Sequence, residues 1–413
     1  MSRLALASVA GTTLEYYDFA VYNTLAALIF GKLFFPSFDP GIGSILAFST
    51  FAVGYLSRPF GGVIFGHLGD RRGRRFVLVV SLLLMGVTTV LIGLLPTYAS
   101  AGIASPVLLV TLRFVQGAAL GGEWAGAVLL SIEHGDARSR GRNGSWAQMG
   151  PSIGTLLATG SIALLTVLLS PEQFVQWGWR VPFFASVMLV GFGLWIRLGV
   201  PETPPFRELE SRGAKAHAPV GEIFRNHWRA LLRVGGARVG PDVFYSLIAV
   251  FTLSYMTAQL SVSRTLALVA LAIGGACNAV CIFLFGSLSD RYGRRAVYGG
   301  GVLASLLWTA VLFPLLDART TILIVLAISG GLILHAAMYG PQAAYIAEQF
   351  PTRVRYAGCS LAYTLAGVFG GGIAPVMFAT LLRAYGTTSA IVSYTMVALV
   401  ITGCVLIFAR RPD

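Results

Sequence analysis

Apolar stretches long enough to cross a membrane follow one another along almost the whole chain, separated by short polar segments rich in Gly, Pro and Arg. About 20 consecutive apolar residues suffice for a helix to cross the hydrocarbon core of a bilayer. The pattern predicts twelve such helices, at residues 5–31, 43–67, 76–96, 104–131, 145–169, 181–200, 233–259, 265–288, 296–316, 320–347, 357–382 and 388–409. The chain is therefore expected to be an all-α integral membrane protein.

The composition supports this interpretation. Hydrophobic residues make up 56% of the 413 residues and charged residues 11%, whereas a soluble domain has roughly 25% charged residues. The first span carries Glu15 and Asp18, has no basic segment before it and is followed by no small-residue cleavage site. A removable signal peptide is therefore not expected, and the first span should remain in the mature protein.

A ten-residue motif occurs twice, each time between the second and third helix of a group of six. It reads "GHLGDRRGRR" at Gly66–Arg75 and "GSLSDRYGRR" at Gly286–Arg295. After the fourth helix of each group an acid and two arginines recur at the same spacing, as Glu133, Arg138 and Arg140 and as Glu348, Arg353 and Arg355. Repetition at this distance indicates a duplicated six-helix unit with pseudo-symmetric halves.

The longest polar stretch separates the two groups and begins "PETPPFRELESRGAKAHAP" at Pro201. Its Pro, charged and small residues do not suit a membrane span, and a short interfacial helix is expected near "VGEIFRNHW". The predicted organisation is an N-terminal six-helix bundle at 1–200, a cytoplasmic loop at 201–232 and a C-terminal six-helix bundle at 233–413.

The net charge of +13 is explained by where the basic residues lie. Most of them fall in the loops on one side of the predicted membrane, whereas the opposite loops hold only Lys32, Arg180, Arg264, Arg319 and Arg383. Because loops rich in Lys and Arg stay on the cytoplasmic side, both termini are expected in the cytoplasm. The membrane is expected to be the cytoplasmic (inner) membrane. The basic runs are interpreted as topology signals beside anionic lipid, and nucleic acid is not expected as a partner.

No metal or cofactor is expected. The four cysteines, Cys277, Cys281, Cys359 and Cys404, all fall within or at the edges of apolar spans. Cys277 and Cys281 are one helical turn apart but have no His or acid nearby, so they are interpreted as packing residues. An intramembrane enzyme is also disfavoured, because neither an HExxH motif nor a Ser-His or Cys-His set is evident.

The repeated pattern Gly-x-Leu-x-Asp-Arg-x-Gly-Arg-Arg resembles the loop signature of the major facilitator superfamily. The segments "GTTLEYYDFAVYNTLAALIFGKLFFP", "GYLSRPFGGVIFGHLGD" and "RFVQGAALGGEWAGA" are similar to its metabolite:proton symporter branch. That branch includes carriers of shikimate, 2-oxoglutarate, citrate, other organic acids, and proline or betaine. The resemblance implies transport by alternating access, with a gate formed by Gly66, Asp70, Arg71, Gly73, Arg74, Arg75, Asp290, Arg291, Gly293, Arg294 and Arg295.

In this gate, Asp70 and Asp290 are expected to meet the N-terminus of a helix from the other half or a neighbouring Arg. Either placement stabilises an anion. The resemblance implies that this contact holds the outward-facing state.

The sequence departs from two relatives of that branch. Osmosensing members continue into a C-terminal coiled coil, whereas this sequence ends at Asp413 after its last span, so osmosensing is not expected. The fifth span contains Gly150, Pro151 and Gly154 of the antiporter motif of drug exporters, but Trp146 replaces its upstream glycine. Export by proton antiport is therefore a weaker alternative than uptake.

Ionisable side chains at membrane depth cost about 2.5 to 3.5 kcal/mol each, so they usually face a cavity and serve function. Glu15 and Asp18 are three residues apart and Tyr22 lies four beyond, so on a helix they form one stripe expected to face a central cavity. Two acids this close in a low dielectric do not both ionise easily, which suits a proton carrier. The resemblance also assigns Glu15 and Asp18 to its first-span motif.

In the fourth span, Arg113 and Glu123 are ten residues apart, roughly 15 Å along a helix, so each needs a partner elsewhere. We expect Arg113 to pair with an acid of the first span. The resemblance matches Arg113 to the Arg-x-x-Gln-Gly pattern associated with proton coupling, and Glu123 to a Gly-Gly-Glu motif. The proton-coupling set is therefore Glu15, Asp18, Arg113 and Glu123. Arg197, near a predicted helix end, is expected to snorkel to the membrane surface.

Arginine binds carboxylates in a bidentate geometry, which favours an organic anion as the substrate. The expected pocket comprises Tyr17, Tyr22, Arg58, Arg113, Trp124, Arg238, Asp242, Tyr245, His335, Tyr339 and Gln342. Purely structural roles stay open: Arg238 and Asp242 can satisfy each other at i, i+4, His335 can be a packed neutral imidazole, and the aromatics can be core or interface residues.

The sequence thus predicts a transporter that imports a small organic acid together with protons, most simply as a monomer. Uptake of proline or betaine by the same machinery is the alternative. The underlying expectation is that buried acids and arginines meet in one hydrated chamber between the two halves.

Overall fold

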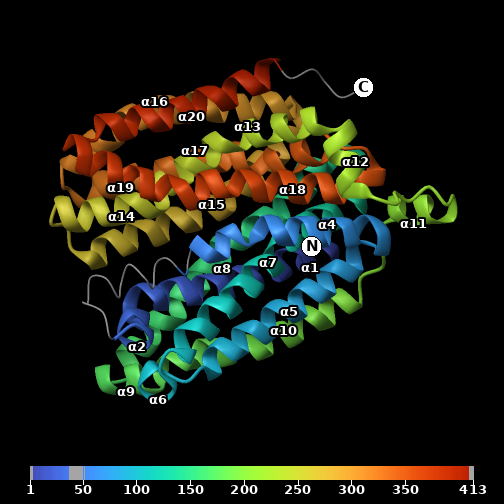
Figure 1. Ribbon diagram of the computed structural model, residues 1–413. Helices are drawn as coiled ribbons and strands as arrows, with labels where there is room; N and C mark the ends of the chain where they lie inside the picture. The colour runs from blue at the N-terminus through green and yellow to red at the C-terminus, as the bar shows by residue number, and fades with distance from the viewer. Residues whose placement is uncertain (1–2, 37–49, 51, 409–413) are drawn as a thin grey trace.

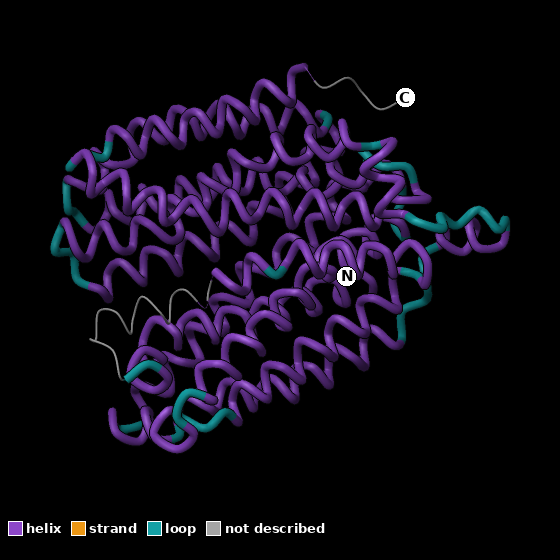
Figure 2. Tube along the Cα trace, viewed as in Figure 1, coloured by secondary structure: helices purple, strands orange, loops and turns teal. Residues whose placement is uncertain are grey.

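The computed structural model describes residues 3–36, 50 and 52–408, and nearly all of these form helices that run roughly side by side (Figure 1). Within these ranges no strand occurs (Figure 2). Because a helix satisfies its own backbone hydrogen bonds, it is the form in which an apolar segment of this length can lie in lipid.

The first half contains six long helical segments. They are α1 (Arg3–Leu25) with its continuation through Ala26–Phe30 into α2 (Gly31–Phe34), α4 (Arg58–Arg72), α5 (Arg74–Leu94), α7 (Ala104–Glu133), α8 (Arg140–Leu168) and α10 (Val181–Leu198). The short helices α6 (Tyr98–Ala101) and α9 (Pro171–Gln176) lie at the same end as α2 (Figure 1).

The second half repeats this arrangement. Its segments are α13 (Trp228–Ser246), continuing through α14 (Thr252–Ser254) to Gln259, then α15 (Arg264–Tyr292), α16 (Arg294–Asp317), α17 (Thr321–Ala347), α18 (Arg355–Gly367), continuing through Val368–Ile373 into α19 (Ala374–Tyr385), and α20 (Ser389–Phe408). With the first half, this gives the twelve-helix architecture that the sequence predicts.

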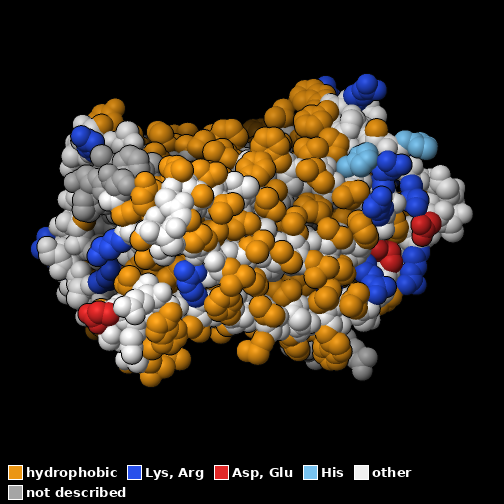
Figure 3. Space-filling view, turned by 60° about the horizontal axis from the view of Figure 1, so that its bottom comes forward, with side chains coloured by type: hydrophobic (Ala, Val, Ile, Leu, Met, Phe, Trp, Pro, Cys, Tyr) orange, Lys and Arg blue, Asp and Glu red, His pale blue; other side chains and the backbone are white. Residues whose placement is uncertain are grey.

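Ten of these segments are long and apolar enough to cross a membrane by length and composition. The other two are the first span, which carries buried acids, and the second, whose expected start at 43–49 lies outside the described residues. In a space-filling view, hydrophobic side chains cover the middle of the molecule and charged side chains gather at its ends (Figure 3).

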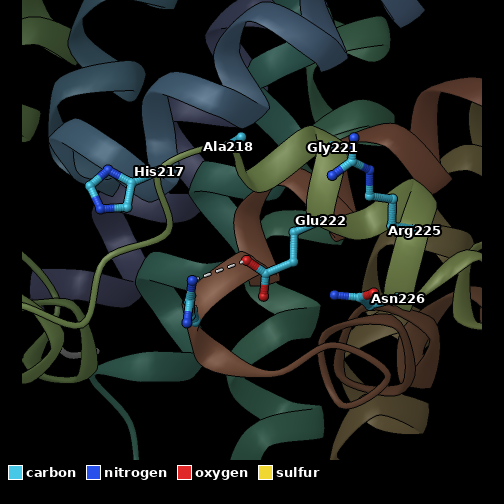
Figure 4. Close-up of a pocket in the computed structure, with 7 residues that line it drawn as sticks. His217, Ala218, Gly221, Glu222, Arg225 and Asn226 are labelled. Atoms are coloured by element: carbon cyan, nitrogen blue, oxygen red, sulfur yellow. Dashed lines mark ion pairs between the residues drawn. The ribbon is translucent and has the colours of Figure 1, made fainter.

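The polar linker between the halves holds α11 (Pro204–Ser211) and α12 (Pro219–Asn226). Both lie at the end of the molecule opposite α2, α6 and α9 (Figure 1). A cavity of about 460 Å³ opens beside α12, where Glu222 forms an ion pair of 3.3 Å with Arg353 (Figure 4). This surface cavity is separate from the membrane-depth residues described below.

The two halves meet along two helix contacts. In one, α8 packs against α15 and α17, and in the other, α4 and α7 pack against α18. A hydrogen bond of 2.9 Å from Ser152 Oγ to Asn278 Oδ1 crosses the first contact. The surface between the halves, called the seam from here on, is thus built from spans 2, 4 and 5 of one half and 8, 10 and 11 of the other.

Close helix approach in the first half depends on glycine. A Cβ added to Gly61 of α4 would collide with the backbone carbonyl of Ala118 in α7, and one added to Gly121 of α7 would collide with that of Arg58. Small residues allow such backbone contacts between membrane helices. They fix how α7 presents its side chains.

We predict that Gly61→Ala lowers the thermal unfolding temperature of the purified protein, because the added methyl group must push α4 and α7 apart, at a cost of about 1 to 3 kcal/mol. The matched control is Gly160→Ala, since nothing lies within 4 Å of a Cβ at Gly160. Equal unfolding temperatures for the two variants would contradict the packing described here.

Candidate functional site

Two buried carboxylates bind one buried guanidinium inside the N-terminal half. Arg197 of α10 places Nη1 2.8 Å from Oε1 of Glu15 in α1 and Nη2 3.0 Å from Oε1 of Glu123 in α7. Nη1 also donates to the carbonyl of Leu78 at 2.6 Å. The three side chains are at most 4% exposed. We call Glu15, Glu123 and Arg197 the carboxylate triad.

The expectation that Arg197 snorkels to the surface is therefore wrong. Its side chain turns inward instead, where Gly11 of α1 lacks the Cβ that would touch its guanidinium. Two buried acids in α1 and α7 need a counter-charge, and Arg197 supplies it. Without Arg197, the spans of the first half hold three acids, Glu15, Asp18 and Glu123, against two arginines, Arg58 and Arg113. This imbalance is the sequence signal that points to such a pairing.

Asp18 occupies a separate site one turn further along α1. It accepts hydrogen bonds from Ser186 Oγ of α10 and, at 3.1 Å, from Thr89 Oγ1 of α5. The carboxyl group is buried, and no ion pair to it is found among the described residues. Glu15 and Asp18 thus do share one face of α1, but that face packs inside the N-terminal bundle.

A chain of hydrogen bonds joins Asp18 to Arg113. Gln116 Nε2 donates to Thr89 Oγ1 at 2.8 Å, and Arg113 Nη1 donates to Gln116 Oε1 at 2.7 Å. The predicted partner of Arg113 was an acid of the first span. That prediction is wrong, because its partner there is Asn23, which accepts from Nη2 at 2.6 Å.

Arg113 is also held by aromatic rings. Its guanidinium lies 4.0 Å from the ring centres of both Phe19 and Tyr22. Cation–π contacts of this kind stabilise a desolvated cation by up to about 2 kcal/mol. These contacts explain why Arg113 is tolerated in a buried position, although no acid among residues 3–36, 50 and 52–408 pairs with it directly.

At the seam, aromatic side chains from both halves stack around a second ion pair. Trp124 of α7 lies face to face with Tyr363 of α18, with ring centres 3.8 Å apart. On Tyr363 also lies the guanidinium of Arg238, 3.2 Å from the ring centre, and this arginine pairs with Asp242 at 2.7 Å. Tyr339 of α17 places its hydroxyl 3.1 Å from that of Tyr363.

Gln148 of α8 ties this group together across the seam. It accepts a hydrogen bond of 2.6 Å from Trp124 Nε1 and donates one of 3.1 Å to the backbone carbonyl of Tyr339. The indole is therefore held in one orientation by a residue that also contacts the other half. We call Trp124, Arg238, Asp242, Tyr339 and Tyr363 the seam cluster.

Arg58 of α4 lies in the same region and has N–H donors that no acceptor binds among the described residues. Its guanidinium stacks 3.9 Å from the ring centre of Tyr55 and 4.6 Å from that of Phe19. Two of its nitrogens, Nε and Nη2, have no hydrogen-bond partner among the described residues although both are buried, and the same holds for Nη1 of Arg238. Buried donors without acceptors are costly, so these nitrogens are suited to receive an anionic ligand.

His335 borders the seam cluster on the C-terminal side. Its ring stacks with Tyr339 at 5.1 Å and lies 4.8 Å from the ring of Tyr245. Its Nδ1 is 3.1 Å from Nδ2 of Asn278. The histidine is thus a packed, hydrogen-bonded member of the surroundings.

Three predicted pocket residues lie away from the seam cluster. Tyr17 directs its hydroxyl to Ser161 and to the carbonyl of Pro182 inside the first half. Tyr22 donates to Thr50, and Gln342 donates to Tyr298 inside the second half. Sequence reasoning in turn missed Tyr55, Gln148, Asn278 and Tyr363, because polar and aromatic side chains are common in spans and only their neighbours in the fold distinguish them.

The prediction of one chamber that holds both the acids and the arginines is also wrong. Glu15, Asp18 and Glu123 are sealed inside the N-terminal bundle at 1 to 2% exposure or less. Arg58 and Arg238 lie at the seam instead. The physical reason is that α1 packs against α5, α7, α8 and α10, which leaves its acidic face no access to the other half.

Both aspartates of the repeated loop motif lie at helix starts of the opposite half. Asp70 accepts hydrogen bonds from the backbone N–H groups of Tyr356 and Ala357 in α18, at 3.2 and 2.9 Å. Asp290 accepts from those of Gly141 and Arg142 in α8, both at 2.8 Å. A carboxylate at a helix N-terminus is stabilised by the helix dipole and the free N–H groups.

The arginine four residues after each aspartate extends the contact. Arg74 is fully buried and pairs with Asp70 and Glu133 at 3.4 Å each, while Arg355 of the other half reaches Glu133 at 3.2 Å. In the second motif, Arg294 pairs with Asp290 at 2.7 Å and with Glu348 at 3.6 Å. The two halves therefore form the same kind of network at the end where the linker lies.

The remaining motif residues shape or border these loops. Gly73 and Gly293 have φ of +107° and +93°, a conformation that favours glycine. A Cβ on Gly66 would lie 3.0 Å from Ala357 of the other half. Among the arginines, Arg75 donates to the carbonyl of Leu198 at 2.6 Å; Arg71 and Arg291 are exposed, and Arg295 is half-buried.

Comparison with known protein families shows to which family this chain belongs. The sequence profile described as "Sugar (and other) transporter" matches residues 4–223, and that described as "Major Facilitator Superfamily" matches residues 242–413. The chain belongs to the major facilitator superfamily. It is therefore a multi-pass membrane transporter and not an enzyme.

Relatives of this transporter cover almost its whole length. The shikimate transporter of Escherichia coli is 40% identical over 92% of the chain and 87% of its own length. The inner membrane metabolite transport protein YhjE of the same organism is 37% identical over 97% and 94%. The proline/betaine transporter of Salmonella typhimurium is 33% identical over 96% and 80%.

Solved structures show the same fold. The proton:xylose symporter XylE bound to 6-bromo-6-deoxy-D-glucose superposes with a TM-score of 0.79 at 17% identity, covering 98% of the chain and 94% of that protein. The transporter FucP in its outward conformation superposes with a TM-score of 0.67 at 18% identity, covering 98% of each chain.

We predict that Arg197→Gln strongly destabilises this transporter, because it leaves two buried carboxylates without their cation. Loss of one partner from a buried ionic group costs about 3 to 5 kcal/mol. The measurement is the thermal unfolding temperature in detergent, with Arg212→Gln as the control, since Arg212 forms a surface pair that is 72% exposed and worth little. Similar stability of both variants would contradict the triad.

Proposed function

We propose that this transporter imports a small organic acid together with protons, by alternating exposure of a site at the seam. The observation that carries the proposal concerns two arginines at the seam. Nε and Nη2 of Arg58 and Nη1 of Arg238 are buried and find no hydrogen-bond acceptor in the described part of the chain. A carboxylate bound there would satisfy them with charge-assisted hydrogen bonds. The stacked rings of Trp124 and Tyr363 would contact the carbon skeleton.

Proton coupling is supported by the balance of buried charge in the first half. Apart from the gate residues Asp70 and Arg74, three arginines, Arg58, Arg113 and Arg197, accompany three acids, Glu15, Asp18 and Glu123, and all six are buried. When the acids are ionised the sum is zero, and each proton that they take up adds a positive charge. Protonation therefore favours anion binding, and anion binding favours protonation, which is the linkage that a symporter needs.

The membrane potential gives protons a second role. An inside-negative potential opposes the entry of an anion by about 2.3 kcal/mol per charge per 100 mV. Each accompanying proton cancels one such charge. We therefore assign proton coupling to Glu15, Asp18, Arg113 and Glu123, with Arg113 linked to Asp18 through Gln116 and Thr89.

The relatives support this substrate class and also a second one. The shikimate transporter carries a carboxylate according to its name, which fits the arginines. The proline/betaine transporter carries zwitterions according to its name. Here Asp242, whose partner Arg238 lies over the ring of Tyr363, offers a carboxylate for a cationic nitrogen. A zwitterion that uses both Arg58 and Asp242 is therefore the alternative.

The repeated motif loops would act as the cytoplasmic gate of this transporter. Asp70 and Asp290 close the end of the seam where the linker and most basic residues lie. By the positive-inside rule this end is cytoplasmic, so both termini would lie in the cytoplasm and the protein in the inner membrane. Breaking these contacts would let the halves rock and open the seam inward.

We predict that the purified protein in proteoliposomes accumulates an organic acid when the outside is made acidic. The panel is radiolabelled shikimate, 2-oxoglutarate, an aromatic acid, proline and betaine. For the acid that is accumulated, Arg58→Gln and Arg238→Gln should each raise the half-saturating concentration about tenfold or more, the effect of one lost charge-assisted hydrogen bond. Arg212→Gln serves as the surface control.

Uptake that ignores the pH gradient would refute proton coupling. Uptake of proline or betaine alone would refute the organic acid and establish the alternative. Unchanged half-saturation in both arginine variants would remove them from the substrate site.

We predict that Asp70→Asn opens the cytoplasmic side, because an amide oxygen and an NH₂ group cannot accept from both backbone N–H groups of α18. The readout is maleimide labelling of Cys359, which is buried in α18, with the other three cysteines changed to serine. Labelling should accelerate roughly tenfold. Glu208→Gln, at an exposed carboxylate, is the control, and equal rates in both variants would contradict the gate.

A further inference from the structure

The carboxylate triad has one negative charge too many for its surroundings. Two carboxylates and one guanidinium sum to −1 in a place where every member is at most 4% exposed. An uncompensated buried charge costs several kcal/mol. Either the charge is balanced by another group, or one of the two carboxyl groups carries a proton.

Within the described part of the chain, the elements around the triad supply no further cation. From α5 comes the backbone carbonyl of Leu78, itself an acceptor. From α18 of the other half comes Tyr356, an uncharged phenol whose hydroxyl donates to the carbonyl of Gly122 at 2.7 Å. Arg74, the next cation in this direction, is already engaged by Asp70 and Glu133.

The oxygens that Arg197 does not bind indicate where the proton lies. Oε2 of Glu15 and Oε2 of Glu123 are both buried and lack a hydrogen-bond donor among the described residues. The two carboxyl groups meet on the same guanidinium, at 2.8 Å from Nη1 and 3.0 Å from Nη2 of Arg197. Two ionised carboxylates would repel in that position, whereas one shared proton turns the contact into a short hydrogen bond and corrects the charge.

The triad also lies directly behind a contact between the halves. Tyr356 donates to the carbonyl of Gly122, the residue before Glu123, and Ser360 donates to that of Gly121 at 2.9 Å. The backbone N–H of Tyr356 is in turn bound by Asp70 at the cytoplasmic gate. If the gate opens by moving α18 away from α7, the hydrogen bond from Tyr356 to Gly122 breaks and the triad becomes accessible to water from the end of the molecule where the gate lies.

We propose that Glu15 and Glu123 share the transported proton against Arg197, and that the proton is released to cytoplasmic water when Tyr356 leaves Gly122. The proton passes from the shared carboxyl pair to water and leaves two carboxylates on Arg197. Arg197 is a positioning residue that holds both acids together. This inference rests on the proposed function for its role in transport, but the shared proton can be tested without any solute.

The test is infrared spectroscopy of the full-length protein in lipid, which detects the C=O stretch of protonated carboxyl groups while the pH is raised. Glu15→Gln and Glu123→Gln should each abolish the same component of this band, because both acids are needed to hold the proton. Glu208→Gln, which changes an exposed carboxylate, should leave the band as in the wild type. Asp18 should contribute a separate component that remains in both triad variants.

Survival of the triad component in both triad variants would overturn the inference, and its loss in only one of them would overturn the sharing. Tyr356→Phe tests the coupling to the gate. Without the hydroxyl that holds Gly122, the triad component should disappear at a pH lower by about one unit, the equivalent of one hydrogen bond. An unchanged titration would separate the proton from this contact.

In proteoliposomes, the two triad variants should keep exchange of the accumulated acid across the membrane but lose accumulation driven by the pH gradient. If the wild type is coupled and both variants accumulate normally, the proposed function stands and the inference fails. If the wild type itself is not coupled, the proposed function fails, whatever the infrared result shows about the proton.

Discussion

The contact on which the rest of the structure depends is one guanidinium, that of Arg197, placed between two carboxylates in the interior of the first six helices. This contact joins α1, α7 and α10. One guanidinium balances only one of the two buried carboxylates, so the second, in our proposal, is neutralised by a proton that Glu15 and Glu123 share. Few charges are tolerated in a membrane interior, and those that remain must be balanced. A change in the protonation of one buried acid must therefore be compensated by another change of charge, such as binding of an anion. Because of this constraint, the contact at Arg197 can couple protonation to the binding of a solute.

Helix α7 carries both sides of this coupling. Glu123 points into the N-terminal bundle and its neighbour Trp124 points into the seam, where it stacks on Tyr363 of the other half. The carbonyl groups of Gly121 and Gly122 accept hydrogen bonds from α18. Glycines in α4 and α7 set the position of this helix to within a backbone contact. A small movement of α7 would therefore change the contacts of the proton site, of the seam cluster and of the cytoplasmic end at the same time.

Much of the fold followed from the sequence because hydropathy and repetition are local or regular signals. The helical segments and the twelve-helix class were predicted, and Asp70 and Asp290 do meet helix starts of the opposite half. What the sequence could not show was which face of a helix meets which neighbour. Arg197 was placed at the surface because it lies near a helix end, and Glu15 and Asp18 were placed at the seam because polar stripes often line cavities. Both errors arise from packing between segments far apart in the chain, which periodicity alone does not encode.

The central claim is that solute binding and protonation are linked through buried charge. The most direct measurement is the proton count on binding: an accumulated acid is added to the purified protein in weakly buffered solution, and the pH is followed with an indicator dye. The account predicts that the protein takes up protons when the acid binds, and that the affinity for the acid falls as the pH rises. Binding of the acid with no proton uptake at any pH at which the protein is folded would contradict it.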